Sequence, residues 1–150
     1  MAKDYEYLED YFVGETMVSP GRTLTEADIV NFAGLTGDWH PLHTDVTYAS
    51  QTPFGERIAH GMLTLCLGTA LPLRLGYLPR SFIAFYGMDS VRFTAPARIG
   101  DTLHCVVDVI ELVDKDDHRG ILVMRQAVKN QKGELLLTLV SKVLCGKRPK

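Results

Sequence analysis

Residues 35–45, with the sequence LTGDWHPLHTD, bring one carboxylate and two imidazoles within six positions of the chain. A histidine titrates near neutral pH and a nearby carboxylate raises its basicity, so Asp38 and His43 could transfer protons to and from one small substrate. Gly37 permits a turn conformation that other residues resist, and Pro41 fixes its own φ. The segment therefore combines acid–base groups with a backbone suited to holding them in place.

The same segment admits two other interpretations. Asp38, His40 and His43 could bind a metal ion, but ligands at this spacing are usually aimed by a helix or a hairpin, and Pro41 disfavours a helix here. We therefore expect no metal site. In the other interpretation the segment is an ordinary polar loop, in which Asp38 accepts a hydrogen bond from a backbone amide and His43 lies on the surface. Taken alone, the segment does not decide between this loop and proton transfer.

A second motif, AHGM at residues 59–62, favours chemistry. It places Gly61 at the start of a long uncharged segment that is expected to form a helix. The first N–H groups of a helix carry a partial positive charge that attracts anions and oxyanions. Glycine there lets a ligand approach the backbone closely, although it could equally serve tight packing. A proton-transfer pair and an oxyanion donor together are suited to a reaction next to a carbonyl group.

The helices that could carry these motifs are indicated by hydrophobic periodicity and capping residues. Thr25 is a candidate N-cap for a helix that ends near residues 34–37 and delivers the first motif onto a loop. Thr44 can cap a second, short helix through about Ser50. Residues 61–75 are apolar on every face, which is typical of a helix buried on all sides, with a bend or a frayed turn at Pro72.

The rest of the chain predicts strands separated by turns rich in Gly, Pro, Asp and Asn. The expected strands are Thr16–Leu24, Phe82–Phe93, Thr102–Val113, Gly120–Lys129 and Glu134–Leu144. The last three suggest an antiparallel meander. One buried helix followed by such strands predicts an α+β fold in which the sheet curls around the helix, within a single domain of residues 1–150. A helix apolar on every face needs more cover than one small sheet offers, so a dimer interface is also expected.

Composition restricts the class of function. Of the 150 residues, 46% are hydrophobic, and the net charge of −2 is dispersed, which excludes the basic stripe of a nucleic-acid-binding protein. The longest apolar stretch, near residues 62–73, is too short to cross a membrane. Cys66, Cys105 and Cys145 match neither a disulfide framework nor a zinc knuckle, and the N-terminal segment lacks the apolar core of a signal peptide. We expect a protein of the cytoplasm.

Three blocks of the sequence resemble one known family. FAGLTGDWHPLHTDVTYAS at residues 32–50 resembles the signature of the MaoC-like dehydratases, also called hydratase 2 or (R)-specific enoyl-CoA hydratases. FGERIAHGMLT at 54–64 and VRFTAPARIGDTL at 91–103 resemble the second and third blocks of that family, in the same order and spacing. The resemblance implies a hotdog fold, an antiparallel sheet wrapped around a long central helix, which is usually dimeric with active sites at the subunit interface.

The resemblance also implies an activity, the reversible hydration of a trans-2-enoyl-CoA to an (R)-3-hydroxyacyl-CoA by a hydro-lyase of fatty acid metabolism. Asp38 and His43 align with the catalytic Asp and His, which would hold and activate one water molecule. Gly61 aligns with the glycine whose N–H faces the thioester oxygen. The CoA thioester is the substrate, and no cofactor is implied.

Three neighbouring residues complete the predicted site. His40 stands where the family usually has Asn, so an amide that orients the loop or the substrate is replaced by a ring that can donate one hydrogen bond, which affects substrate choice. Trp39 could line the acyl pocket or simply pack for its area. His60, just before the oxyanion glycine, is expected to form a structural hydrogen bond there.

Two alternatives compete with hydration. Many hotdog thioesterases carry a carboxylate on the central helix, and residues 61–76 contain no Asp or Glu. A non-catalytic acyl-CoA-binding protein would have no need of the set formed by Asp38, His43 and Gly61. We therefore rank a hydratase above a thioesterase, and both above a binding protein.

Overall fold

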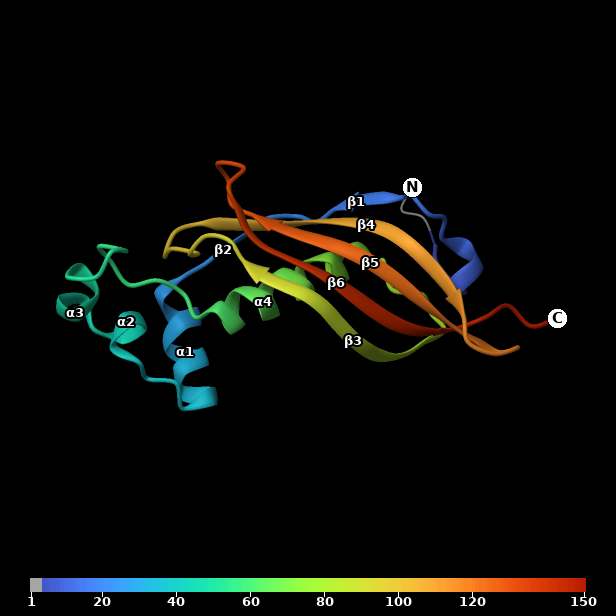
Figure 1. Cartoon of the computed structure of the whole chain (residues 1–150), viewed down its shortest axis with the longest axis horizontal. Helices are drawn as coiled ribbons and strands as arrows, with labels where there is room; N and C mark the ends of the chain where they lie inside the picture. The colour runs from blue at the N-terminus through green and yellow to red at the C-terminus, as the bar shows by residue number, and fades with distance from the viewer. Residues whose placement is uncertain (1–3) are drawn as a thin grey trace.

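The computed structural model describes residues 4–150 and contains a curved antiparallel sheet with one helix along its concave face (Figure 1). The long strands are β3 (Phe82–Phe93), β4 (Thr102–Asp114), β5 (Arg119–Lys129) and β6 (Leu135–Gly146), and the short strands are β1 (Thr16–Val18) and β2 (Arg22–Thr23). The strand order is β1-β4-β5-β6-β3, and β2 pairs with β4. β4, β5 and β6 form the predicted meander, and β3 lies at one edge of the sheet.

The helices are α1 (Glu26–Thr36), α2 (Pro41–Thr44), α3 (Val46–Ser50) and α4 (Gly61–Ala70), with 3₁₀ turns η1 (Leu8–Asp10) and η2 (Leu71–Leu75). α4 is the central helix. Gly68 lets it approach the sheet, because a Cβ at this position would overlap Cγ2 of Val128. At Pro72, where a bend or a frayed turn was expected, the chain continues from α4 into the 3₁₀ turn η2, with Pro72 in its first turn. Within residues 4–150, none of the helices is both long and apolar enough to span a membrane.

The hydrophobic core lies between α4 and the side chains of the strands that face it. Leu63 and Leu65 of α4 belong to one buried cluster with Val107, Met124 and Leu139 of the sheet. Buried and more exposed residues alternate along β4 and β6, so one face of the sheet meets the helix. A sheet curved around a single helix confirms the predicted α+β fold.

The prediction that the central helix is buried on every side is wrong for a single chain. Met62, Cys66, Ala70 and Leu73 are all exposed. These positions recur every three or four residues, so they form one stripe along α4 and η2, which we call the exposed stripe. The sheet packs on the opposite face of the helix and leaves this stripe open.

Two local predictions are also corrected. The expected strand Thr16–Leu24 is divided into β1 and β2, because Pro20 between them has no N–H for a sheet ladder. The cap of the short helix that ends at Ser50 is Asp45 instead of Thr44. The Asp45 carboxylate accepts a hydrogen bond from Tyr48 N–H at 3.0 Å, whereas Thr44 is the last residue of α2.

Candidate active site

Helix α1 lies beside the start of α4, and α2 and α3 lie farther out at the same end of the molecule (Figure 1). The loop between α1 and α2 carries Asp38. Thr25 caps α1 as predicted: its side chain accepts from Asp28 N–H, and the Asp28 carboxylate accepts from Thr25 N–H. Gly37 ends α1 in a left-handed conformation with φ of 77°, which is accessible to glycine at little cost. The sequence therefore fixes where α1 ends and where the loop with Asp38 begins.

His43 lies in α2, which corrects the expectation that Pro41 prevents a helix in this segment. Pro41 occupies the first turn of α2, where its missing N–H costs no intrahelical bond. His40 is the N-cap, and its Nδ1 accepts a hydrogen bond from Leu42 N–H at 3.1 Å. In the neutral ring the proton is then on Nε2, which remains available for the one hydrogen bond that His40 is expected to donate. An Asn side chain at an N-cap is also an acceptor, so His40 can replace Asn in this local role.

Asp38, His43 and His60 converge, although they come from a loop, from α2 and from the residue before α4. A carboxylate oxygen of Asp38 and one ring nitrogen of each histidine all lie within 4.8 Å of one another. The rings of His43 and His60 stack with their centroids 3.9 Å apart. Asp38 accepts a hydrogen bond from His40 N–H at 3.3 Å, as the polar-loop interpretation predicts. His43 does not lie on the surface as that interpretation predicts, because it is partly buried and faces the other two groups.

Hydrogen bonding determines which nitrogen of His43 can react. Its Nδ1 lies 2.8 Å from the carbonyl oxygen of Ile58, which can only accept, so Nδ1 carries the proton and Nε2 keeps its lone pair. Burial lowers the pKa of His43, while the bond to Ile58 and the charge of Asp38 act in the opposite direction. His43 is therefore neutral near pH 7 and can act as a base through Nε2.

The same three residues are close enough to share a metal ion, and they differ from the set that the sequence suggested, because His60 takes the place of His40. One nitrogen of each ring is already committed: His43 Nδ1 to the carbonyl oxygen of Ile58, and His60 Nε2 to that of Asp38. The Asp38 carboxylate, His43 Nε2 and His60 Nδ1 remain. The first two are sufficient for proton transfer, which requires no ion.

The N-terminus of α4 supplies the candidate oxyanion donor. No side chain caps this helix, whose N-cap residue is His60, so the N–H of Gly61 has no intrahelical partner. Gly61 lines two cavities of about 280 Å³ each. One of them contains Asp38, His43 and His60. An oxygen atom bound at Gly61 N–H would therefore have the acid–base pair on one side.

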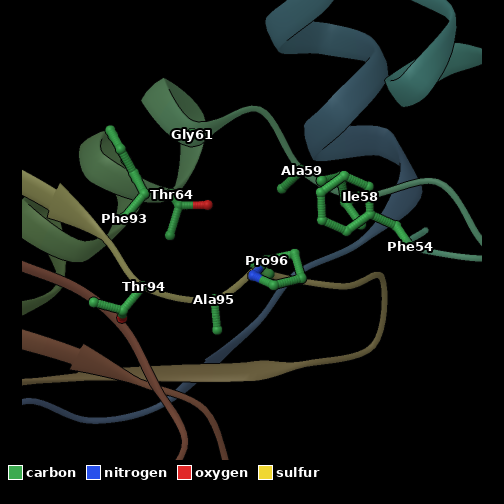
Figure 2. A pocket seen from close by; sticks show the side chains of 10 residues that line it. Phe54, Ile58, Ala59, Gly61, Thr64, Phe93, Thr94, Ala95 and Pro96 are labelled. Carbon is green, nitrogen blue, oxygen red and sulfur yellow. The ribbon is translucent and has the colours of Figure 1, made fainter. Parts of the chain in front are cut away.

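The other cavity beside Gly61 is mainly apolar (Figure 2). Its walls are Phe54 and Ile58 from the segment before α4, Phe93 at the end of β3, and Pro96 and Ala97 from the loop that follows. No charged side chain lines it among the residues that the structure describes. The cavity therefore suits an uncharged, apolar group next to the oxyanion donor.

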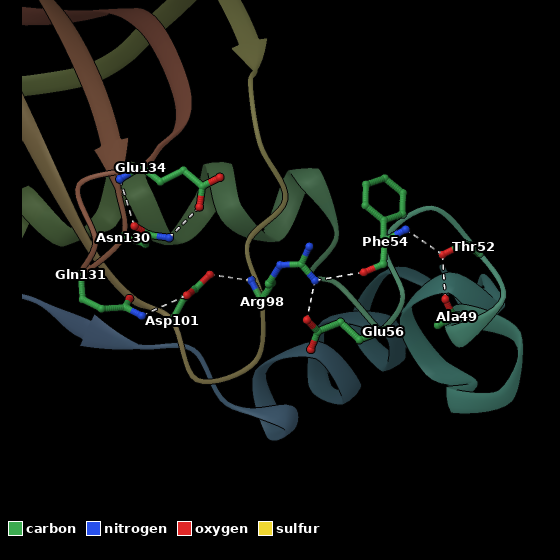
Figure 3. Close-up of polar contacts among 9 residues, drawn as sticks. All are labelled: Ala49, Thr52, Phe54, Glu56, Arg98, Asp101, Asn130, Gln131 and Glu134. Atoms are coloured by element: carbon green, nitrogen blue, oxygen red, sulfur yellow. Dashed lines mark hydrogen bonds and ion pairs between the residues drawn. The ribbon is translucent and has the colours of Figure 1, made fainter.

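Arg98 connects the walls of this apolar cavity (Figure 3). Its Nη1 donates to the carbonyl oxygen of Phe54 at 3.2 Å and pairs with the Glu56 carboxylate. Its backbone N–H donates to the buried Asp101 at 2.9 Å, and Asp101 accepts a further bond from Gln131 at 3.2 Å. The cavity is thus tied to the turn between β5 and β6, and the charge of Arg98 is compensated locally.

Trp39 lies outside both cavities. It is 55% exposed, and its ring packs over α1, where a Cβ on Gly34 would lie 3.9 Å from Cζ2 of Trp39. Neither set of residues that lines the cavities beside Gly61 includes Trp39. In the single chain this geometry favours packing over a role as a pocket wall.

Known proteins resemble the chain over most of its length. The family model described as MaoC like domain matches residues 12–133. The (R)-specific enoyl-CoA hydratase of Rhodospirillum rubrum is 42% identical over 112 residues, which cover 71% of this chain and 72% of that protein. The 3-hydroxybutyryl-CoA dehydratase of Methylorubrum extorquens is 40% identical over 107 residues, 71% of this chain and 66% of that one. Protein MaoC of Klebsiella aerogenes is 43% identical over 98 residues, which cover 65% of this chain and only 29% of that longer protein.

Solved structures give the same picture. The monoamine oxidase regulatory protein of Archaeoglobus fulgidus has a TM-score of 0.93 at 41% identity, over 99% of both chains. An (R)-hydratase of Pseudomonas aeruginosa has a TM-score of 0.79 at 30% identity, over 96% of this chain and 88% of that one. A Mycobacterium tuberculosis protein described as having a double hotdog fold has a TM-score of 0.77 at 19% identity, over 97% of this chain and 46% of that one. The fold is therefore the hotdog fold.

Proposed function

Because the chain belongs to the MaoC-like domain family, we propose that it catalyses the reversible hydration of a trans-2-enoyl-CoA to an (R)-3-hydroxyacyl-CoA. The observation that carries this proposal is the position of Asp38 and His43 beside the uncapped N-terminus of α4 at Gly61. An (R)-specific enoyl-CoA hydratase and a 3-hydroxybutyryl-CoA dehydratase among the relatives support both the reaction and its stereochemistry. The enzyme would thus be a hydro-lyase.

In the proposed mechanism the thioester oxygen accepts a hydrogen bond from Gly61 N–H, and the dipole of α4 stabilises the negative charge that develops on that oxygen. His43 Nε2 removes a proton from a water molecule that also donates to the Asp38 carboxylate, and the water oxygen bonds to C3. The electrons of the double bond move toward the thioester oxygen. The His43 imidazolium then returns the proton to C2, and dehydration is the reverse sequence.

The substrate in this proposal carries an uncharged acyl group, which occupies the apolar cavity beside Gly61. Among residues 4–150, no charged side chain lines that cavity, and the nearby guanidinium of Arg98 is paired with Glu56. A dicarboxylic acyl group would place its second carboxylate against apolar side chains without a partner, which is costly. Straight or branched aliphatic enoyl-CoAs are therefore the expected substrates.

The direct test is to follow the enoyl-thioester absorbance band of crotonyl-CoA while free thiol is measured in parallel. We expect the band to disappear without release of free CoA, and the product to be the (R)-3-hydroxy thioester by chiral analysis. Because the mechanism uses only protein groups and water, dialysis against EDTA should leave the rate unchanged. A rate that is lost with EDTA and restored by a divalent cation would contradict the metal-free mechanism.

The same assay separates the competing functions. Release of free thiol would favour a hotdog thioesterase. Tight binding of several enoyl-CoAs without turnover would favour a non-catalytic acyl-CoA-binding protein. This outcome is included because the similar Archaeoglobus fulgidus protein is named as a regulatory protein. Either result would contradict the proposed hydratase.

We also propose that the enzyme is at least a homodimer, formed through β3 and the exposed stripe. β3 presents a 12-residue edge at one end of the sheet, where it pairs with β6 alone among the described strands. Phe82, Ile83, Phe85 and Phe93 on this strand are 41–51% exposed. A cavity lined by residues from β3 and from the exposed stripe joins the two surfaces. A long apolar edge of this kind favours pairing with a second chain, which would also cover α4.

Phe85→Lys should therefore convert the dimer into a monomer, because a charged side chain in the centre of an apolar interface loses its solvation without a partner. Analytical ultracentrifugation of wild type and variant measures the change. Val18→Lys is the matched control, because Val18 is 56% exposed but lies on β1 at the other edge of the sheet, and this variant should remain dimeric. A wild type that sediments as a monomer at micromolar concentration would contradict the proposed interface.

We also propose that the protein acts in the cytoplasm. Cys66, Cys105 and Cys145 are all free thiols. Burial raises the pKa of Cys105 to about 12 and that of Cys145 to about 11, so both remain protonated and unreactive near pH 7. Unpaired cysteines are typical of proteins in a reducing compartment.

A further inference from the structure

His60 contacts each part of the proposed site. It is 2% exposed, and its Nε2 lies 3.0 Å from the carbonyl oxygen of Asp38. Its ring stacks on that of His43 with an interplanar angle of 29°. His60 is also the residue immediately before Gly61 and the N-cap residue of α4. One buried side chain thus links the acid–base pair to the candidate oxyanion donor.

The hydrogen bond of His60 defines its tautomer. A carbonyl oxygen can only accept, so Nε2 carries the proton that is directed at Asp38. Nδ1 is buried and has no hydrogen-bond partner among residues 4–150. His60 therefore directs a fixed donor at the loop that carries Asp38.

The surroundings of His60 hold its ring in one place. The ring of Phe32 from α1 lies 5.0 Å from it, between centroids, and the ring of His43 from α2 lies at 3.9 Å. Thr64 Oγ1 donates to the carbonyl oxygen of His60 at 3.3 Å, which ties the backbone of His60 to the second turn of α4. Because both the backbone and the ring of His60 are held in place, the ring can in turn hold His43 and the loop of Asp38 in place.

We propose that His60 is a positioning residue, whose N–H bond to Asp38 and whose stack on His43 together set the distance between the acid–base pair and Gly61 N–H. The bond from His43 to Ile58 fixes one atom of the His43 ring, and the stack fixes the orientation of the ring about that bond. The catalytic part of this inference rests on the proposed function. The placement of His43 does not, and it can be measured separately.

The pKa of His43 provides a second readout, because His60 is one of the groups that surround the His43 ring. The titratable groups that face it are Asp38 from the loop, His40 from the cap of α2 and His60 from the start of α4. Asp38 favours the protonated form of His43, whereas burial and the two neighbouring histidines disfavour it. Removing the His60 ring admits water and removes one of those neighbours, so both effects raise the pKa of His43.

Three variants separate the two contacts. His60→Gln keeps an N–H near the carbonyl oxygen of Asp38, His60→Phe keeps a ring against His43, and His60→Ala keeps neither. We expect kcat to fall by about 10²-fold in His60→Ala, the usual cost of a displacement of about 1 Å, and by less in the other two, with KM changed less than kcat. The acid limb of the pH profile of kcat/KM should move to higher pH in His60→Ala.

An NMR titration of the His43 ring gives the same comparison without substrate, and the pKa of His43 should rise in His60→Ala and rise less in His60→Phe. Leu65→Ala, which removes a buried core side chain from the same helix, should lower the melting temperature but leave the pKa of His43 unchanged. If His60→Ala does not fold, the Gln and Phe variants provide the comparison.

Wild-type kcat and an unchanged pKa of His43 in the folded His60 variants would overturn the inference and reduce His60 to a packing residue. A wild type that is inactive toward every enoyl-CoA, but whose His43 titration still responds to His60, would refute the proposed function and support the positioning role. The two failures are therefore distinguishable.

Discussion

Replacing His43 with Asn is expected to lower kcat by about 10²–10⁴-fold, the usual contribution of a general base. Asn is the informative replacement because its amide N–H can still donate to the carbonyl oxygen of Ile58, which now accepts from His43 Nδ1 at 2.8 Å. The variant thus loses the lone pair of Nε2 but keeps the bond that holds α2 against the segment before α4. KM should change little, because the lost group acts on water instead of on the thioester.

Asp38→Asn should cause a loss in the same range. The amide keeps an oxygen for the N–H of His40, which donates to Asp38 Oδ1 at 3.3 Å, but it carries no charge to stabilise the imidazolium that forms on His43. Because the two groups act on one water molecule, the double variant should be little worse than either single variant. Losses that multiply in the double variant would contradict a shared role.

The pH dependence of the wild type follows from the state of His43. Burial lowers the pKa of this histidine below its ordinary value of about 6.5. The neutral ring is the base, so hydration should be fully active above that pKa and should be lost as the pH falls through it. His118→Asn, which removes an exposed histidine between β4 and β5, should change neither kcat nor the acid limb. Wild-type kcat in His43→Asn would exclude His43 as the base.

Local sequence patterns predict the strands and helix α1 because their signals are contiguous in the chain. The pattern predicts β3 with its observed bounds, and the meander strands within one or two residues, since Gly, Asp and Asn mark the turns. The sequence predicts that α4 needs more cover than its own sheet, but it does not predict which face stays exposed, because an apolar helix face has the same composition whether it packs on its own sheet or on a second chain. Hydrophobicity alone does not identify the partner surface.

The site is predictable to the extent that its groups are close in sequence. Asp38 and His43 are found from their spacing and from the family resemblance. The structural hydrogen bond expected of His60 is present, but its partner is not predicted, because that partner is a backbone oxygen 22 residues earlier and no side-chain pattern reports the contact. The helix at Pro41 is missed for a different reason: proline breaks a helix in its interior but favours its first turn, and the sequence does not show where α2 begins.

Replacing Gly61 with Pro is expected to lower kcat by about 10²–10³-fold, the usual cost of losing one oxyanion donor. Proline removes the N–H and keeps the helix, because Gly61 is the first residue of α4, where proline is well tolerated. The preceding residue also fits, because the ψ of His60 is 138°, outside the α region that proline disfavours in its predecessor. A circular dichroism spectrum that matches the wild type would show that the fold is retained.

Gly61→Ala separates the lost donor from simple crowding. Its N–H is retained, and its new Cβ would lie 3.2 Å from a ring carbon of Phe93, a contact that a small rotation of this ring relieves. The alanine methyl group narrows the approach of the substrate, so it should act mainly on KM. The proline variant should act mainly on kcat, because the N–H stabilises the charge of the enolate-like transition state more than that of the bound thioester. Equal losses of kcat in both variants would mean that Gly61 provides space and not a hydrogen bond. The negative charge on the thioester oxygen would then have to be stabilised by other N–H groups in the first turn of α4.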